Sequence, residues 1–400
     1  MSLKEGAGLA LALRLAEVRD SPTMAIGAEA IRLRAAGEDV VDWGAGEPDF
    51  DTPEHIKEAG SAAIRGNHTR YTPNPGTPEL RKAIAERYRL DYGLALEPSE
   101  VIVTHGGKHG LFNLMMALLD PGDEVIIPNP HWMTFSEQAR LLGAKPVLIE
   151  TEEADGFGVT AAQVERATSP KTKLVVVCSP GNPTGAVIEE REFLSLADLA
   201  GGKGFSLLWD DTYGRLSFIP MSARLLPELR DRAAGNFLIA GSASKSYAMT
   251  GWRLGWAIGP KPVIAGCGVL QSHMTSNACS ISQQAALHAL TSPQAEVERM
   301  RQEYRWRRDR LRAALCEIPG LSCALPGGGF YLFPRVASFF NREAPDSTEF
   351  SRRLLQKERV AVVPGQAFGR DGHVRVSFAT SRERIEEGIQ RLRRFLTSPQ

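Results

Sequence analysis

Short apolar segments alternate with segments of helical periodicity through the middle of the chain. Each apolar segment is too short for a helix, and turn residues or a helical pattern follow it, as at residues 111–119 and 189–200. Strands that are apolar throughout are buried on both faces, which is typical of a mostly parallel sheet covered by helices. The expected strands are residues 101–104, 124–127, 145–149, 174–178, 205–209 and 237–240.

The pattern changes towards the C-terminal end. Residues 293–317 predict one long helix, and its many arginines are expected to face solvent. Apolar strands then alternate with helical stretches, which predicts a second domain of α+β type. The expected elements are strands at residues 329–333, 360–363 and 374–378, and helices at residues 347–356 and 381–396.

We therefore predict an α/β protein with a large, mostly parallel-sheet domain and a smaller α+β domain. A chain of 400 residues exceeds the size of a typical single hydrophobic core, which agrees with two domains. The first 45 or so residues are expected to fold onto the smaller domain, and residues 15–45 to close over the cleft as a lid. The predicted domains are residues 46–292 and, for the discontinuous small domain, residues 1–45 with 293–400.

The charge balance limits the kinds of partner. Lysine plus arginine and aspartate plus glutamate number 47 each, so the formal net charge at pH 7 is zero. This balance argues against broad attraction to nucleic acid or to a membrane surface. No apolar run approaches the roughly 20 residues that a bilayer crossing requires. Small-molecule partners are therefore expected.

The N-terminal segment and the cysteines predict a cytoplasmic location. An apolar stretch at residues 8–13 lies between Glu5 and Arg14, which is too early and too short for a secretory signal. The five cysteines are scattered, odd in number and without C-x-x-C spacing. We interpret them as reduced thiols, with neither a disulfide framework nor a metal site.

Lys245 has the most informative surroundings in the chain. It lies in residues 241–256, which read GSASKSYAMTGWRLGW and follow an apolar run. A lysine among small residues can approach a carbonyl group and form an imine, and Ser242 and Arg253 can bind a phosphate on the same molecule. This combination fits pyridoxal phosphate, an aldehyde that carries a phosphate. A single lysine is more often a solvated loop residue, so the decision rests on the other motifs.

Two further strand ends carry side chains suited to that cofactor. Asp210 follows the strand at residues 205–209, and a carboxylate there can keep a pyridine nitrogen protonated. Tyr213 and Asn182, the latter in the turn SPGNPTG at residues 179–185, can donate hydrogen bonds to a ring oxygen. Aspartate and asparagine are common in ordinary turns, so neither motif is specific alone.

Three other features add an anion site and a substrate contact. Gly107 and Lys108 join a strand to a helix, where free backbone N–H groups bind phosphate well. Trp132 follows the next strand end and could stack on the cofactor ring, although an interior aromatic is an equal alternative. Arg375 lies in an alternating strand and could bind a carboxylate bidentately, unless it is a surface arginine.

With these motifs in place, the chain resembles the fold-type I aminotransferases, in the class I group that includes bacterial aspartate aminotransferases. The similarity runs from Ser21 to the C-terminus, and the order of its motifs makes chance agreement negligible. The matching segments are residues 44–53 (GAGEPDFDTP), 71–76 (YTPNPG), 79–81 (ELR), 179–185, 210–213 (DDTY), 242–253 and 374–378 (VRVSF).

The resemblance implies roles around the cofactor ring and its phosphate. Lys245 is similar to the family's Schiff-base lysine, which also moves the proton, and Asp210 to the partner of the pyridine nitrogen. Asn182 and Tyr213 are similar to the donors to the ring oxygen. The residues that match the phosphate site are Gly107, Lys108, Ser242 and Arg253.

The resemblance also implies a homodimer with shared active sites. Tyr71 is similar to a tyrosine that reaches the phosphate of the neighbouring subunit. The amino-acid site is implied to consist of Gly46, Trp132, Asn182 and Arg375.

Three positions depart from the family pattern. Asp211 stands where glutamate is common after the pyridine aspartate, and His109 where glutamine is frequent. Neither is expected to touch the chemistry directly. Asp20 occupies a position that is often proline, which puts the N-terminal contacts to the substrate in doubt.

The implied reaction is a ping-pong transfer of an amino group between an amino acid and a 2-oxo acid. Lys108, Ser21 and Thr23 lie where the aspartate-using subgroup contacts a second carboxylate, so we expect aspartate as donor and 2-oxoglutarate as acceptor. If Lys108 serves only the phosphate, aromatic, alanine-type or prephenate substrates stay open. The same fold also supports carbon–sulfur lyases, cyclopropane-forming synthases and, rarely, regulators.

Overall fold

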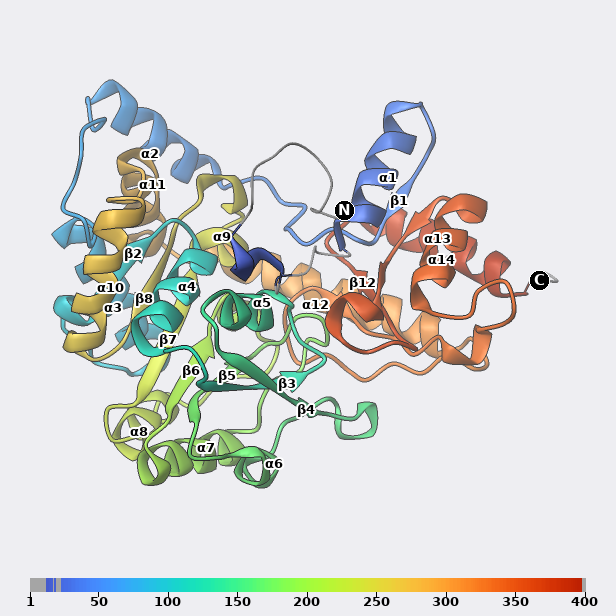
Figure 1. Cartoon of the computed structure of the whole chain (residues 1–400). Coiled ribbons are helices and arrows are strands. Elements are labelled where there is room, and N and C mark those ends of the chain that lie inside the picture. Colours follow the sequence, from blue (N-terminus) through green and yellow to red (C-terminus); the bar gives the residue numbers. More distant parts are fainter. Residues whose placement is uncertain (1–11, 17, 19–22, 398–400) are drawn as a thin grey trace.

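The computed structural model describes residues 12–16, 18 and 23–397 of the chain (Figure 1). Its centre is a seven-stranded sheet in the order β2-β8-β7-β6-β5-β3-β4. All neighbouring strands are parallel except at β8, which runs antiparallel to β2 and β7. The strands are β2 (Val101–Thr104), β3 (Glu124–Asn129), β4 (Lys145–Glu150), β5 (Thr172–Cys178), β6 (Ser206–Asp210), β7 (Phe237–Ser242) and β8 (Gly255–Ile258).

The predicted α/β fold is confirmed, and each of the six predicted central strands is present. β8 was missed by the sequence analysis. Only two short helices, α9 (Ala243–Ser246) and η5 (Thr250–Trp252), separate it from β7, so the alternation of strands with longer helices did not mark it.

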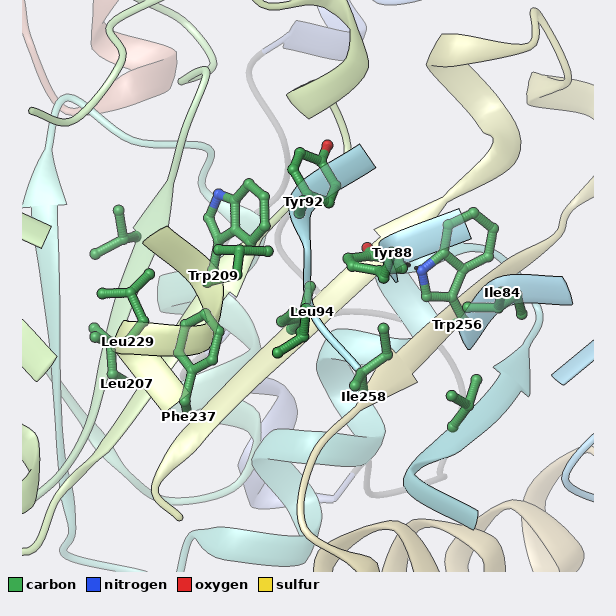
Figure 2. Close-up of a cluster of buried hydrophobic side chains, with 14 of the residues drawn as sticks. Ile84, Tyr88, Tyr92, Leu94, Leu207, Trp209, Leu229, Phe237, Trp256 and Ile258 are labelled. Atoms are coloured by element: carbon green, nitrogen blue, oxygen red, sulfur yellow. Dashed lines mark hydrogen bonds between the residues drawn. The ribbon is translucent and has the colours of Figure 1, made fainter. Parts of the chain in front are cut away.

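Alternate residues along the strands supply two separate hydrophobic layers. On β6, Leu207 and Trp209 enter one layer and Leu208 enters the other. Figure 2 shows part of the first layer, in which Tyr88 and Tyr92 lie among Trp209, Trp256 and neighbouring aliphatic side chains. Burying each large apolar side chain contributes about 1.5–3 kcal/mol, so both layers stabilise the sheet strongly.

Helices cover both layers. The first is covered by α2 (Glu54–Arg65), α3 (Pro78–Tyr92), α6 (Ala161–Ala167), α7 (Glu190–Lys203), α8 (Leu225–Arg232) and α11 (Ser280–Thr291). The second is covered by α4 (Gly107–Leu118), α5 (Thr134–Leu141) and α10 (Lys261–Met274). The remaining short helices are η1 (Leu13–Ala16), η2 (Pro98–Glu100), η3 (Glu153–Asp155), η4 (Gly214–Leu216), α9 (Ala243–Ser246), η5 (Thr250–Trp252), η6 (Ala337–Phe339) and η7 (Gly365–Phe368).

A third hydrophobic cluster forms a smaller unit beside the sheet (Figure 1). The single long helix predicted at residues 293–317 is confirmed as α12 (Ala295–Cys316). The unit also contains the antiparallel sheet β11-β12-β9 and two helices that cover it. These elements are β9 (Tyr331–Leu332), β11 (Val363–Pro364), β12 (Val374–Ser377), α13 (Ser347–Glu358) and α14 (Arg382–Thr397).

The single strand predicted at residues 360–363 is wrong. The chain forms two short strands there, β10 (Val360–Ala361) and β11, separated by Val362. β10 pairs in parallel with β1 (Val41–Asp42), whereas β11 pairs with β12. An apolar run does not reveal a change of partner sheet, because both strands are equally buried.

The N-terminal part of the described chain packs on the smaller unit. α1 (Thr23–Ala35) contributes Ile26 and Ala30 to a cluster with Leu355 and Ala361. The β1–β10 pairing ties residues far apart in sequence to the same unit. The domain boundaries at residues 45/46 and 292/293 stay a prediction.

Within the described part of the chain, no helix has both the length and the apolar composition that a bilayer crossing requires. All five cysteines are free thiols. The cytoplasmic location inferred from them stays a prediction.

The packing of α14 on β1 yields a stability prediction. A Cβ at Gly388 would lie 2.1 Å from Cζ2 of the fully buried Trp43. Gly388→Ala should therefore destabilise the protein by about 1–3 kcal/mol through overpacking. Gly202→Ala, in α7 with no atom within 4 Å of the new Cβ, is the control and should be neutral or stabilising. Urea unfolding of both variants measures the difference. Equal urea midpoints for Gly388→Ala and Gly202→Ala would contradict the close packing of Gly388 on Trp43.

Candidate active site

A cavity of about 600 Å³ lies between the carboxyl ends of the central strands and the smaller unit. Side chains after β3, β5, β6 and β7 meet there because the carboxyl ends of parallel strands share one edge of the sheet. The structure brings together eleven of the twelve site residues predicted from the sequence. They are Gly46, Gly107, Lys108, Trp132, Asn182, Asp210, Tyr213, Ser242, Lys245, Arg253 and Arg375.

Lys245 lies on α9, directly after β7, and its side chain is half-buried in the cavity. Burial lowers the pKa of its amine to about 8, against the opposing effect of Glu47 and with help from Arg375 and Arg253. The Nζ atom donates a hydrogen bond to the backbone oxygen of Gly46 at 2.6 Å. A substantial uncharged fraction near neutral pH makes this amine a nucleophile and a base.

Asp210 ends β6 and is 2% exposed. The backbone N–H of Thr212 donates to its Oδ1 at 3.0 Å, and no lysine or arginine of the described residues forms an ion pair with it. Burial raises the pKa of this carboxyl, and the hydrogen bonds from Thr212 oppose the shift. Because an unpaired buried carboxylate is costly, the site suits a ligand that presents a cationic N–H group.

Two glycines open an anion site at the start of α4. Gly106 has φ +81°, and a Cβ there would lie 2.7 Å from Nη2 of Arg253. A Cβ at Gly107 would lie 3.2 Å from the Cβ of Ser242. Glycine thus lets a cationic guanidinium, a hydroxyl and the N-terminus of a twelve-residue helix converge. Free N–H groups and the helix dipole favour a phosphate or carboxylate at this place.

Arg375 enters the cavity from β12 of the smaller unit. Its Nη1 donates to Oδ1 of Asn182 at 3.0 Å, and its Nη2 to the backbone oxygen of Gly44 at 2.9 Å. The guanidinium also lies 4.4 Å from the ring centroid of Tyr331. Its buried Nε has no hydrogen-bond partner among the described residues. The guanidinium borders the cavity, where a cation suits a ligand carboxylate.

The remaining predicted residues are divided between the cavity and the surface. The ammonium group of Lys108 lies 4.9 Å from the Trp132 ring centroid, and burial, then Arg253, lowers its pKa. The hydroxyl of Tyr213 lies 3.0 Å from that of Tyr331. Tyr71 is 92% exposed and does not line the cavity of its own chain.

Several lining residues escaped the sequence analysis. Tyr331 lies in a predicted strand, but strand alternation alone does not say which face borders the cavity. Phe368 lies in η7, where Pro364 and Gly365 indicate a turn but not its place at the cavity, and the Arg375 guanidinium lies 5.1 Å from its ring centroid. The other unpredicted lining residues are Gly44, Met133, Thr134, Glu137, Cys178, Thr212, Ser244, Thr250 and Ala367.

The N-terminal predictions are largely outside the described chain. Asp20 and Ser21 lie outside the described residues, and so does the side chain of Thr23. Among the described residues, η1 lies against α5, whose first turn lines the cavity. The lid at residues 15–45 stays a prediction.

Comparison with known proteins gives one consistent result. The model of the family "Aminotransferase class I and II" matches residues 38–392. An aspartate aminotransferase of Geobacillus stearothermophilus is 42% identical over 96% of this chain and 98% of its own length. An aspartate/prephenate aminotransferase of Thermus thermophilus is 43% identical over 96% of this chain and 98% of its own length.

Solved structures agree with this result. Thermus thermophilus aspartate aminotransferase with maleate superposes with a TM-score of 0.91 at 42% identity, over 97% of this chain and all of that chain. The Rhizobium meliloti aspartate aminotransferase has a TM-score of 0.90 at 40% identity, over 96% of this chain and 98% of that chain. The predicted fold-type I architecture is thereby confirmed.

The environment of Lys245 yields a pH prediction. Its pKa falls from 10.5 to about 8, so its uncharged fraction should rise through pH 8 with increasing pH. Acylation of Lys245 in the cofactor-free protein, followed by peptide mass spectrometry, should reach half of its maximal rate near pH 8. The exposed Lys171 in the same digest is the internal reference for the reagent. A half-maximal rate near pH 10.5 would contradict the burial described.

Proposed function

This chain belongs to the class I and II aminotransferases, enzymes that use pyridoxal phosphate, and we propose that it transfers the amino group of L-aspartate to 2-oxoglutarate. One observation carries the proposal. A half-buried lysine and an unpaired buried carboxylate share a cavity with three cationic groups, Arg253 and Lys108 near the start of α4 and Arg375 on the smaller unit. A cofactor phosphate and a substrate with two carboxylates would together need all three cations.

The residues present fit the cofactor. Asp210 has no cationic partner of its own among the described residues, so it suits the protonated ring nitrogen. The space that Gly106 and Gly107 leave beside Arg253 suits the phosphate. Lys245 would attach the aldehyde carbon. When bound, the cofactor supplies an electron-withdrawing ring next to the substrate carbon that loses its proton.

The side chains around the ring would tune and align it. Tyr213 and Asn182 would donate to the ring oxygen, and Trp132 would cover a ring face. The Oδ1 atom of Asn182 accepts from Arg375, which leaves its NH2 group for that role. Ser242 would join Arg253 on the phosphate. These assignments are consistent with the positions of all five side chains on the cavity wall.

Lys245 and Arg375 would carry the substrate chemistry. Nζ of Lys245 would take the proton from the substrate's α-carbon and deliver it to the cofactor carbon within the same half of the reaction. The second half would run these steps in reverse. An amine with a pKa of about 8 is matched to this task near neutral pH. Arg375 would hold the α-carboxylate through its guanidinium, which Asn182 and Gly44 fix in the cavity wall. The bond to be broken is thereby oriented.

The charge of the cavity favours a second carboxylate on the substrate. Lys108 is held over Trp132 and lies apart from Arg375 on the opposite unit. The names of the relatives point the same way, since they include aspartate and aspartate/prephenate aminotransferases, and maleate is also a dicarboxylate. Prephenate carries two carboxylates as well and is the second candidate.

Lys108→Ala tests the assignment of the donor. Removal of a charge-assisted hydrogen bond worth about 1.5–3 kcal/mol should lower kcat/KM for aspartate by roughly 10- to 100-fold. Values for alanine and phenylalanine should change little in a donor panel with 2-oxoglutarate. Lys203→Ala, on the exposed end of α7, is the matched control and should leave all donors unchanged.

The panel also contains the outcomes that contradict the assignment. An equal loss for every donor, with weaker cofactor binding, would assign Lys108 to the phosphate and remove the argument for aspartate. Release of pyruvate and ammonia from cystathionine without any 2-oxo acid would favour a carbon–sulfur lyase on the same fold.

We also propose a homodimer in which Tyr71 reaches the phosphate of the neighbouring site. Its 92% exposure supports a role outside its own subunit. A hybrid dimer of a Lys245→Ala chain and a Tyr71→Phe chain would then contain one complete site, with roughly half the wild-type activity. The parent variants should both be impaired. If Tyr71 served its own subunit, the hybrid would be no more active than Tyr71→Phe.

A further inference from the structure

Asp211 lies directly behind Asp210 and is held at both of its carboxylate oxygens. The hydroxyl of Tyr88 donates to Oδ2 at 2.6 Å, and that of Tyr92 donates to Oδ1 at 3.1 Å. Both tyrosines belong to the C-terminal half of α3 and are buried, as is Asp211 at 7% exposure. Figure 2 shows the two rings near one another among the buried side chains of the first hydrophobic layer. We refer to Asp211, Tyr88 and Tyr92 as the clamp.

The surroundings leave the clamp little freedom. The Trp256 indole Nε1 donates to the hydroxyl of Tyr88 at 3.1 Å. A Cβ at Gly214 would lie 1.9 Å from Oδ1 of Asp211, and a Cβ at Gly241 would lie 2.1 Å from Nε1 of Trp256. The backbone of η4 and the end of β7 therefore pack directly against the clamp. It is a close-packed polar group, in which small displacements are costly.

The clamp is attached to the turn that carries two proposed cofactor contacts. The side chain of Asp210 lines the cavity, whereas that of Asp211 enters the core. The backbone N–H of Asp211 donates to the oxygen of Ala240 on β7 at 2.8 Å, and Thr212 holds Asp210 from the cavity side. Tyr213 follows on the same turn. A rotation of this turn about its backbone would redirect Asp210 and Tyr213 together.

From this geometry we infer that the clamp is a positioning device that aims Asp210 and Tyr213 at the bound cofactor and thereby sets the ionisation of the cofactor's linkage to Lys245. The inference rests on the proposed function, because it concerns the cofactor contacts assigned there. It gives a role to the aspartate at position 211, where the family commonly has glutamate. In this chain, α3 supplies the two phenols that hold it.

The charges around the clamp agree with this role. Burial raises the pKa of Asp211 to about 8, while the hydrogen bonds from Tyr88 and Tyr92 oppose the shift. The other ionisable groups that act on it are Asp210, Asp91 of α3 and, through Tyr92, Arg215 of η4. Both hydrogen bonds favour the ionised carboxylate, because each phenol donates to one of its oxygens.

The test uses the holoenzyme and follows the bound cofactor by its visible absorbance as a function of pH. Tyr88→Phe removes one hydroxyl and keeps the ring. The midpoint of the titration should move upwards by about one pH unit. Weaker pairing with Asp210 would reduce the positive charge on the ring nitrogen, and the Lys245 nitrogen would then keep its proton to a higher pH. The double variant Tyr88→Phe/Tyr92→Phe should move further. Both should keep the reducible cofactor adduct at Lys245.

Tyr304→Phe is the matched control, since it removes another buried tyrosine hydroxyl that contacts an aspartate, Asp49, away from the clamp. Tyr304→Phe should lower the melting temperature about as much as Tyr88→Phe does, and it should leave the midpoint of the cofactor's pH titration unchanged. Midpoints of the clamp variants that equal that of wild type, with the adduct intact, would overturn the inference and leave the proposed function standing. A double variant no different from Tyr88→Phe would remove Tyr92 from the clamp. Absence of an adduct in the wild-type protein would instead sink the proposed function.

Discussion

Desolvation of two opposite charges in one cavity is the constraint on which this structure depends. Lys245 is buried far enough for its amine to be partly uncharged near neutral pH, and Asp210 is buried without a cationic partner among the described residues. Neither arrangement stabilises the protein by itself, since buried ionisable groups lose hydration. Both become favourable when a ligand brings an aldehyde and a cationic N–H group. The cavity is thus prepared for a cofactor of that chemistry.

The fold supplies this arrangement from segments far apart in the sequence. Parallel strands place Asn182, Asp210 and Lys245 at one edge of the sheet, because their carboxyl ends coincide there. Arg375 comes from the smaller unit and meets Asn182 directly. The substrate site is therefore assembled between two hydrophobic units. Their relative placement controls the distance between the Lys245 amine and the Arg375 guanidinium, to which we assign proton transfer and carboxylate binding.

The sequence was sufficient for the residues whose chemistry is marked by motif and strand position. Lys245, Asp210 and Asn182 each follow an apolar strand, and the structure places all three on one cavity wall. The sequence was insufficient where the hydrogen-bond partners of a residue come from distant elements. Nothing in the sequence near Asp211 reveals Tyr88 or Tyr92, because hydrogen bonds between α3 and the turn after β6 depend on tertiary packing. The same limit explains the missed strand β8 and the division of residues 360–363 between two sheets.

Borohydride reduction of the purified protein loaded with pyridoxal phosphate tests the central claim most directly. Peptide mass spectrometry should find a pyridoxyl group on the side chain of Lys245, and Lys245→Arg should lose it while remaining folded. A protein that stays colourless with the cofactor, or whose only adducts lie on surface lysines, would contradict the account at its foundation.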